Sequence, residues 1–147
     1  DTALLERMLQ DPFFSQPAPK STGLEYFNMS WIENMLDDSC LDEVDVQATL
    51  AELTAKGIAL GLSDSDLPAR LLVCGGGVHN NYLMRRIAAN LPDMVVETTA
   101  RYGADPDWVE SLLFAWLARE RLHERNQDTR PITGADGPVL LGDIYLP

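Results

Sequence analysis

The chain has 147 residues, of which 11 are Lys or Arg and 23 are Asp or Glu, so its formal net charge is −12. This length predicts one domain or one lobe of a larger protein, and a composition with 46% hydrophobic and 23% charged residues excludes disorder of the whole chain. The acidic balance argues against nucleic acid or a membrane surface as the main partner, because both are bound by basic faces. A nucleotide stays open, because backbone amides can bind phosphate locally.

The cysteines and the apolar runs bear on the compartment. Cys40 and Cys74 show neither a metal-ligand spacing nor a disulfide framework, which fits a reducing compartment, and Cys74 is predicted to be buried. No run of 18 uncharged apolar residues predicts a membrane span, and charged residues interrupt the first twenty positions, unlike a signal peptide. Because the chain begins with Asp1, we expect a processed protein or a piece of a longer one.

The N-terminal half is predicted to be helical. The predicted segments are a helix over residues 2–10, an irregular connection over 12–23, a short helix ending at residue 36, a longer helix over 42–60 and a polar loop over 63–66. Ser30 and Glu33 form a capping-box pattern at the start of the short helix. Val46, Leu50 and Gly57 fall on one stripe of the longer helix, where the glycine permits close approach to a neighbour.

A strand, a turn, a helix and a second strand follow. Residues 71–74 are a continuous apolar run, the pattern of a strand buried on both faces. Three glycines at 75–77 end this run, and Asn80 or Asn81 can cap the helix that comes next. Residues 94–98 predict the second strand. This order is a βαβ crossover, so we expect the two strands to be parallel.

A second amphipathic helix is predicted over residues 106–125, with Asp105 as its N-cap and Pro106 at its first position. Its apolar face includes Trp108 and Trp116, which are predicted to lie in the core. The remaining segments are a turn cluster over 133–138 and a terminal strand or extended tail over 139–145.

The glycine run is the first candidate site. A glycine run between a buried strand and a helix N-terminus lets a ligand meet backbone N–H groups with no Cβ in the way. Gly75, Gly76 and Gly77 therefore suit a nucleotide, and an empty tight turn is the alternative reading. No P-loop sequence is present. A dinucleotide-binding pattern fits in part, since Glu97 lies at the expected spacing, but Asn80 replaces the third glycine.

Three further residues have a functional and a structural reading. Glu110, in the first turns of the 106–125 helix, could bind sugar hydroxyls or orient a nucleophile, and a solvated carboxylate is the alternative. His79 could touch phosphate or ribose, or be structural. Lys20, one of two lysines in the chain, is by default a solvated loop residue. No set of residues with metal-ligand spacing is present.

Five stretches together resemble the C-terminal part of the anhydro-N-acetylmuramic acid kinase family, in the expected order and over nearly the whole chain. The stretches are PFFSQPAPKSTGLEYFN (12–28), DVQATLAELTAKGI (45–58), LLVCGGGVHNNYLMRRIA (71–88), VESLLFAWLA (109–118) and ITGADGPVLLGDIYLP (132–147). The combination of CGGG-x-HN with PKSTG-x-E-x-F carries the specificity of the resemblance.

The resemblance implies an activity and a set of site residues. Family members use ATP with Mg²⁺ to open the 1,6-anhydro ring of anhydro-N-acetylmuramic acid with water and to phosphorylate O6, giving N-acetylmuramic acid 6-phosphate. They serve peptidoglycan recycling in the bacterial cytoplasm and form homodimers. By the same resemblance, Gly75, Gly76, Gly77 and Asn80 are nucleotide-binding residues, and Glu110 is the catalytic residue, facing the sugar and the attacking water.

The resemblance also implies a fold. The family belongs to the sugar kinase/actin/Hsp70 superfamily, so we expect an α/β fold: a partial ribonuclease-H-like lobe with helices packed on a small, mainly parallel sheet. Residues 1–147 would be the C-terminal lobe of a two-lobed sugar kinase, because the Gly-Thr-Met-Ser-Gly-Thr start of the N-terminal lobe does not occur here. The alternatives are a noncatalytic nucleotide-binding or regulatory module and a Rossmann-type NAD-binding domain.

Overall fold

A computed structural model describes residues 1–36, 40–62 and 70–145. The loop predicted over 63–66 lies outside the described residues. Helices dominate the described part, and its sheet consists of two parallel strands, which gives the chain α/β character. The elements are α1 (Thr2–Leu9), α2 (Pro12–Ser15), α3 (Met29–Leu36), α4 (Glu43–Leu62), β1 (Arg70–Val73), η1 (Gly76–His79), α5 (Asn81–Asn90), β2 (Val95–Thr98), η2 (Thr99–Tyr102), η3 (Pro106–Trp108), α6 (Val109–Leu122) and α7 (Arg130–Thr133).

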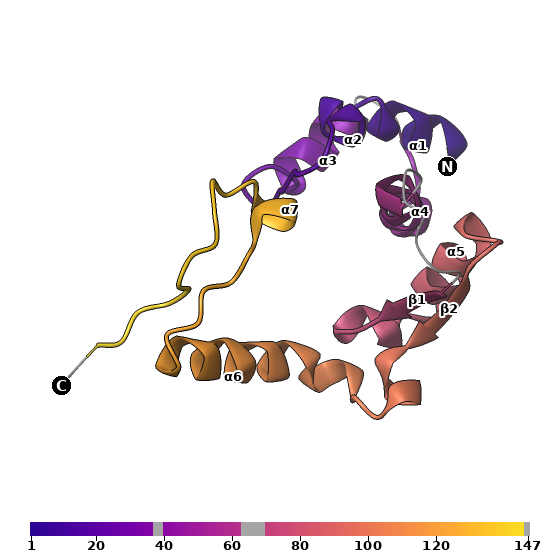
Figure 1. Cartoon of the computed structure of the whole chain (residues 1–147). Coiled ribbons are helices and arrows are strands. Elements are labelled where there is room, and N and C mark those ends of the chain that lie inside the picture. The colour runs from indigo at the N-terminus through magenta and orange to yellow at the C-terminus, as the bar shows by residue number, and fades with distance from the viewer. Residues whose placement is uncertain (37–39, 63–69, 146–147) are drawn as a thin grey trace.

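The elements follow one another along an open arc (Figure 1). Helices α1 to α4 form one end of this arc, α5 with β1 and β2 lies next to α4, and α6 runs along the other end. The C-terminal segment returns to the first end, where the α7 helix is followed by Gly134. An ideal Cβ on Gly134 would lie 3.2 Å from Pro19, and its φ of +70° favours glycine.

The buried core lies between α1, α3 and α4. Leu4 and Met8 of α1 contact Leu53 of α4, and partly buried apolar side chains surround these three. The helices predicted over 2–10 and 42–60 are confirmed, with Asp1 capping the first. Gly57 of α4 is confirmed as a point of close approach, because a Cβ there would lie 3.4 Å from the ring of Phe14.

Two details of the N-terminal half differ from the sequence prediction. The connection over 12–23 begins with a helical turn, α2, whose Phe13 N–H donates to the side chain of Asp11 at 2.9 Å. The short helix α3 is capped by Asn28 and not by Ser30, because the Asn28 side-chain oxygen accepts the Trp31 N–H at 3.1 Å. Ser30 therefore lies inside the helix.

The βαβ crossover is confirmed: β1 and β2 pair in parallel from Arg70↔Val95 to Val73↔Thr98, with α5 between them in sequence. The prediction that β1 is buried on both faces is wrong. Alternate residues of β1 are exposed, and Leu72 retains 41% of its accessible surface. Cys74, predicted to be buried, is also exposed. In the described part, a two-stranded sheet has too few neighbours to cover both faces.

The helix predicted over 106–125 is present as η3 followed by α6, and Asp105 and Pro106 take the predicted capping positions. The prediction that its tryptophans lie in the core is wrong, since Trp108 is 64% and Trp116 is 44% exposed. Among the described residues, this face of α6 is covered only in part, where Leu117 lines a pocket with Leu141 and Ile144 of the C-terminal segment. Residues 139–145, predicted as a terminal strand or an extended tail, form no strand, and Val139 makes an isolated antiparallel bridge with Gln127.

The described part of the chain contains no helix that combines the length and the apolar character needed to cross a membrane.

Candidate nucleotide and sugar site

The glycine turn (residues 75–77) lies where β1 ends and α5 is about to begin. Gly75 has φ +80° and ψ 178°, a conformation that L side chains rarely adopt, so glycine is required at this position by the backbone. Gly76 is different: an ideal Cβ there would meet nothing within 4 Å. Packing within the described residues does not explain this glycine, and the open space in front of it leaves room for a ligand.

Asn80 closes the glycine turn and starts the next helix. Its side-chain oxygen accepts the Leu83 N–H at 3.0 Å, which makes Asn80, and not Asn81, the N-cap of α5. The structure therefore gives Asn80 a capping role at the positive end of a ten-residue helix that points toward the glycine turn. Asn80 also lines a pocket between α4 and α5, of about 490 Å³, whose other walls include Gln47 and Tyr82.

Glu110 lies in the first turn of α6 and is exposed. Among the described residues, no hydrogen bond or ion pair holds its carboxylate. This side chain is therefore free to accept a hydrogen bond from a sugar hydroxyl or from water. The η3 turn just before α6 is capped by Asp105, whose carboxylate accepts the Asp107 N–H at 3.0 Å.

The structure brings the glycine turn together with η3, the short turn just before α6, although about thirty residues separate them in sequence. The Gly75 N–H donates to the carbonyl of Pro106 at 2.9 Å. Beside this bond, His79 Nε2 lies 2.9 Å from Asp107 Oδ1 and 3.0 Å from Oδ2. Sequence reasoning considered His79 without a partner and missed its pairing with Asp107, since no local spacing connects residues so far apart.

Glu97 does not support a dinucleotide site. Its carboxylate forms ion pairs with Arg70 at 3.5 Å and with Arg101 at 2.8 Å, and its side chain is only 10% exposed. In a dinucleotide-binding fold, the corresponding acid accepts hydrogen bonds from ribose hydroxyls. Here two guanidinium groups already engage it. The position of the third glycine is occupied by Asn80, which caps α5.

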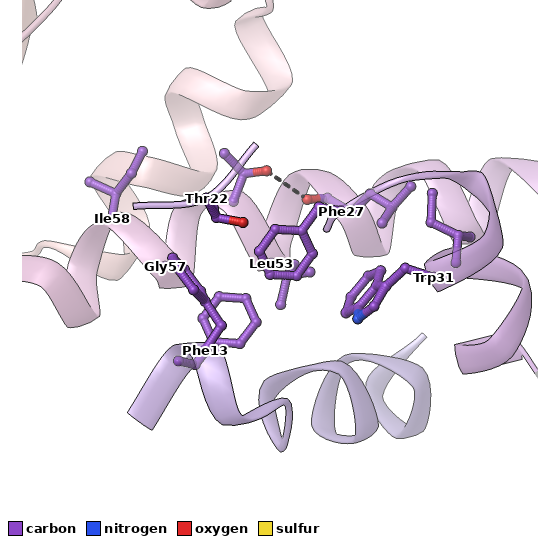
Figure 2. Close-up of a pocket in the computed structure, with 11 residues that line it drawn as sticks. Phe13, Thr22, Phe27, Trp31, Leu53, Gly57 and Ile58 are labelled. Carbon is purple, nitrogen blue, oxygen red and sulfur yellow. Dashed lines mark hydrogen bonds between the residues drawn. The ribbon is translucent and has the colours of Figure 1, made fainter. Parts of the chain in front are cut away.

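Lys20 has a structural role and lies away from the glycine turn. Its ammonium group donates to the carbonyls of Phe13 at 2.8 Å and Phe14 at 3.2 Å, and it lies 4.8 Å from the centre of the Phe13 ring. Next to it, an apolar pocket of about 470 Å³ opens between α2, α3 and α4. Figure 2 shows that aromatic rings, including Phe27, dominate its walls. No lining residue carries a charge, so this pocket does not suit a nucleotide.

A model of a kinase family matches the chain over residues 1–147, and this match identifies the class of protein. That family is described as anhydro-N-acetylmuramic acid kinase, and the chain belongs to it. The resemblance stated from the sequence is thereby confirmed.

Several curated relatives carry the same description. Proteins named anhydro-N-acetylmuramic acid kinase from Xanthomonas oryzae pv. oryzae (strain MAFF 311018) and Pasteurella multocida (strain Pm70) are 52% and 49% identical to the chain, each over 99% of its length. The protein of that name from Pseudomonas syringae pv. syringae (strain B728a) is 48% identical over 99% of the chain. The chain spans 39% of the length of the first two relatives and 40% of the third.

Proposed function

We propose that residues 1–147 are the C-terminal lobe, of ribonuclease-H-like architecture, of a two-lobed ATP-dependent sugar kinase, a phosphotransferase with an alcohol acceptor. Its substrate is anhydro-N-acetylmuramic acid, and its product is N-acetylmuramic acid 6-phosphate, formed in peptidoglycan recycling. The observation that carries this proposal is the match of a single kinase family to the whole chain, at about half identity to proteins of that name.

The glycine turn is the proposed nucleotide-binding part. Open space in front of Gly76 and the glycine-only backbone of Gly75 support a close approach by the ligand. Backbone N–H groups and the N-terminal end of α5 favour negative charge there. Asn80 contributes by fixing the start of α5, and the pocket that it lines lies beside the turn. ATP therefore fits the hydrogen-bond donors that these residues present.

Glu110 is the proposed catalytic residue of this lobe. In the proposed reaction, water forms a bond to C1 of the sugar, the bond between C1 and O6 breaks, and O6 takes the γ-phosphoryl group of ATP, releasing ADP and a proton. A free carboxylate near the sugar can accept a hydrogen bond from the attacking water and orient it. The exposure of Glu110 and its freedom from ion pairs in the described residues support this role.

Mg²⁺ enters the proposal only as the companion of ATP. The described residues contain no group of three or more His, Cys, Asp and Glu side chains that could hold a metal ion. Magnesium with ATP is commonly held by phosphates and one or two carboxylates, and we derive no step through the ion.

The compartment and the assembly are part of the same proposal. Cys40 and Cys74 are both free and exposed, which supports a reducing compartment, and we place the protein in the cytoplasm. The full-length protein is proposed to be a homodimer, which light scattering of the purified protein tests.

The direct test uses the full-length protein with ATP and anhydro-N-acetylmuramic acid. We expect ADP release and a product with phosphate on O6, detected by mass spectrometry and phosphorus NMR. ATP binding with no phosphate transfer would instead support the noncatalytic nucleotide-binding module. Binding of NAD in place of ATP, in the same titration, would support the Rossmann-type alternative.

A further inference from the structure

Two separate contacts join the segment from Gly75 to His79 to η3, the turn just before α6. One is the backbone hydrogen bond from the Gly75 N–H to the Pro106 carbonyl, at 2.9 Å. The other is the side-chain contact between His79 and Asp107, in which the Nε2–H of His79 donates to a carboxylate with oxygens 2.9 Å and 3.0 Å away. Both contacts connect the same two short segments, η1 with its preceding glycine and η3.

The two contacts together restrict more than either does alone. A single hydrogen bond holds two atoms near a fixed distance but leaves the segments free to rotate about it. A second contact, offset along both segments, removes most of that rotation. In the described residues, the His79–Asp107 pair is the side-chain contact that supplies this second restraint between η1 and η3.

The restraint reaches Glu110 through continuous helical backbone. Asp107 belongs to η3, and the next residues, Trp108 and Val109, keep right-handed helical dihedrals as η3 passes into α6. Asp107 and Glu110 are three positions apart, so they lie about one turn from each other on this backbone. A shift of Asp107 relative to the glycine turn therefore moves Glu110 as well.

We propose that His79 and Asp107 are positioning residues that set the placement of Glu110 relative to the nucleotide held at the glycine turn. This inference rests on the proposed kinase function. Neither residue touches the reacting atoms: His79 acts through Asp107, and Asp107 acts through the backbone that carries Glu110. The pair thus couples the nucleotide part of the site to the sugar part.

Because the pair is exposed, the positioning role and a purely structural role predict different effects of removing it. The side chain of His79 is 65% exposed and that of Asp107 is 50% exposed. Polar side-chain pairs this open to water contribute little to folding stability. If the pair were only a surface contact, its removal would therefore leave kcat unchanged. If the pair positions Glu110, its removal displaces a catalytic group, and a small displacement of this kind reduces turnover strongly.

The test measures kcat and the KM for ATP in the full-length protein for His79→Ala, Asp107→Ala and the double variant. Either single change is expected to lower kcat about tenfold or more with a change in the KM for ATP of less than about threefold. The kcat of the double variant is expected to be no lower than the lower of the two single-variant values, because both changes break the same contact. His79→Gln keeps an N–H donor at similar reach and is expected to recover much of the lost kcat.

Two controls make the outcome decisive. His123→Ala removes the other histidine of the chain, which lies at the far end of α6, and is expected to leave kcat unchanged. Thermal unfolding shows whether each variant is folded. Wild-type kcat in His79→Ala, losses that multiply in the double variant, or a rise in the KM for ATP at constant kcat would each overturn the positioning role. Those results leave the kinase proposal intact, which fails only if the wild-type protein transfers no phosphate to the sugar.

Discussion

The carboxylate of Glu52 on α4 holds the guanidinium group of Arg86 on α5, 34 residues further along the chain. Arg86 donates from Nε and also from Nη2, the latter to Oε1 at 3.1 Å, and Asn90 donates to the same oxygen at 3.0 Å. The hydrogen bonds from Arg86 lower the pKa of Glu52, although burial opposes its ionisation. Because α5 follows directly from the glycine turn, this contact helps to fix the proposed nucleotide site to the helical core.

Replacing this carboxylate is expected to weaken the junction between α4 and α5. Glu52→Gln removes the ion pair but keeps the size of the side chain, so the midpoint of thermal unfolding should fall at neutral pH. The lowered pKa means that the stabilisation is present above the unfolded pKa of about 4.3 and is lost as the pH falls through the folded value. The difference between wild type and variant should therefore shrink in acid. Glu6→Gln on the exposed side of α1 is the matched control, and an equal loss there would contradict the prediction.

Asp11 is the second carboxylate with a definable role in stability. It is 7% exposed, and it accepts hydrogen bonds from Trp31 Nε1, the Phe13 N–H and the Tyr26 hydroxyl, each at 2.9 Å. Burial alone would raise the pKa of Asp11, but these hydrogen bonds outweigh it and lower the pKa from its ordinary value. Asp11→Ala should reduce the free energy of unfolding by about 1–3 kcal/mol, because it leaves these donors without their acceptor.

Chemical denaturation of the full-length protein measures this loss, provided that the transition of this lobe is resolved. Tyr26→Phe removes one donor and keeps the ring, so it should cost less than Asp11→Ala. Since the pKa of Asp11 is lowered in the folded state, its contribution should disappear as the pH falls below about 4. If Tyr26→Phe proved more damaging than Asp11→Ala, the shared carboxylate would not be the centre of this cluster.

Local signals explain which parts of the fold could be predicted. Asn80, Asp105 and Pro106 act on their own next turn of helix, and the parallel pairing of β1 with β2 follows from a short crossover. The sequence predicts all of these, with Asn80 as one of two candidate caps of α5. The cap of α3 was misplaced because Asn28 and Ser30 are both good capping residues only two positions apart. Propensity alone cannot choose between neighbours of this kind.

Contacts between distant residues explain most of what was missed at the site. Nothing in the local sequence around His79 indicates Asp107, because their approach depends on how η1 meets η3. The burial of Leu72 and Trp116 was overestimated for a related reason. An apolar pattern predicts that a side chain needs a cover, and for these two residues the part of the chain that the structure describes supplies only a partial one.

Gly76 offers a test of the proposed nucleotide site that is independent of folding. An added side chain meets nothing within 4 Å in the described residues, so Gly76→Val should leave the unfolding midpoint close to that of wild type. It should raise the KM for ATP about tenfold or more, because the side chain would occupy the space proposed for the ligand. Gly137→Val, also unobstructed within 4 Å but distant in sequence, is the control. An unchanged KM for ATP in Gly76→Val would remove the glycine turn from the nucleotide site.

Glu110→Gln tests the proposed catalytic role. The amide preserves the size of the side chain and removes the charge, and no ion pair among the described residues is lost. Folding should therefore be unaffected, while kcat should fall about a hundredfold, within the range that a positioned acid or base contributes. Steady-state kinetics of the full-length protein with ATP and the anhydro sugar measure the effect. If this variant kept the wild-type kcat, another group would have to orient the attacking water.

The exposed apolar surface of α6 has a consequence for how the family can vary. The helix that carries Glu110 presents Leu112 at 56% and Trp116 at 44% exposure, so its final placement depends on whatever packs against it in the longer family members. A substitution at that contact would tilt the helix and displace the carboxylate at its first turn. Natural selection on turnover would therefore act on residues far from the substrate. Residues on the two sides of this contact should covary among family members rather than change independently.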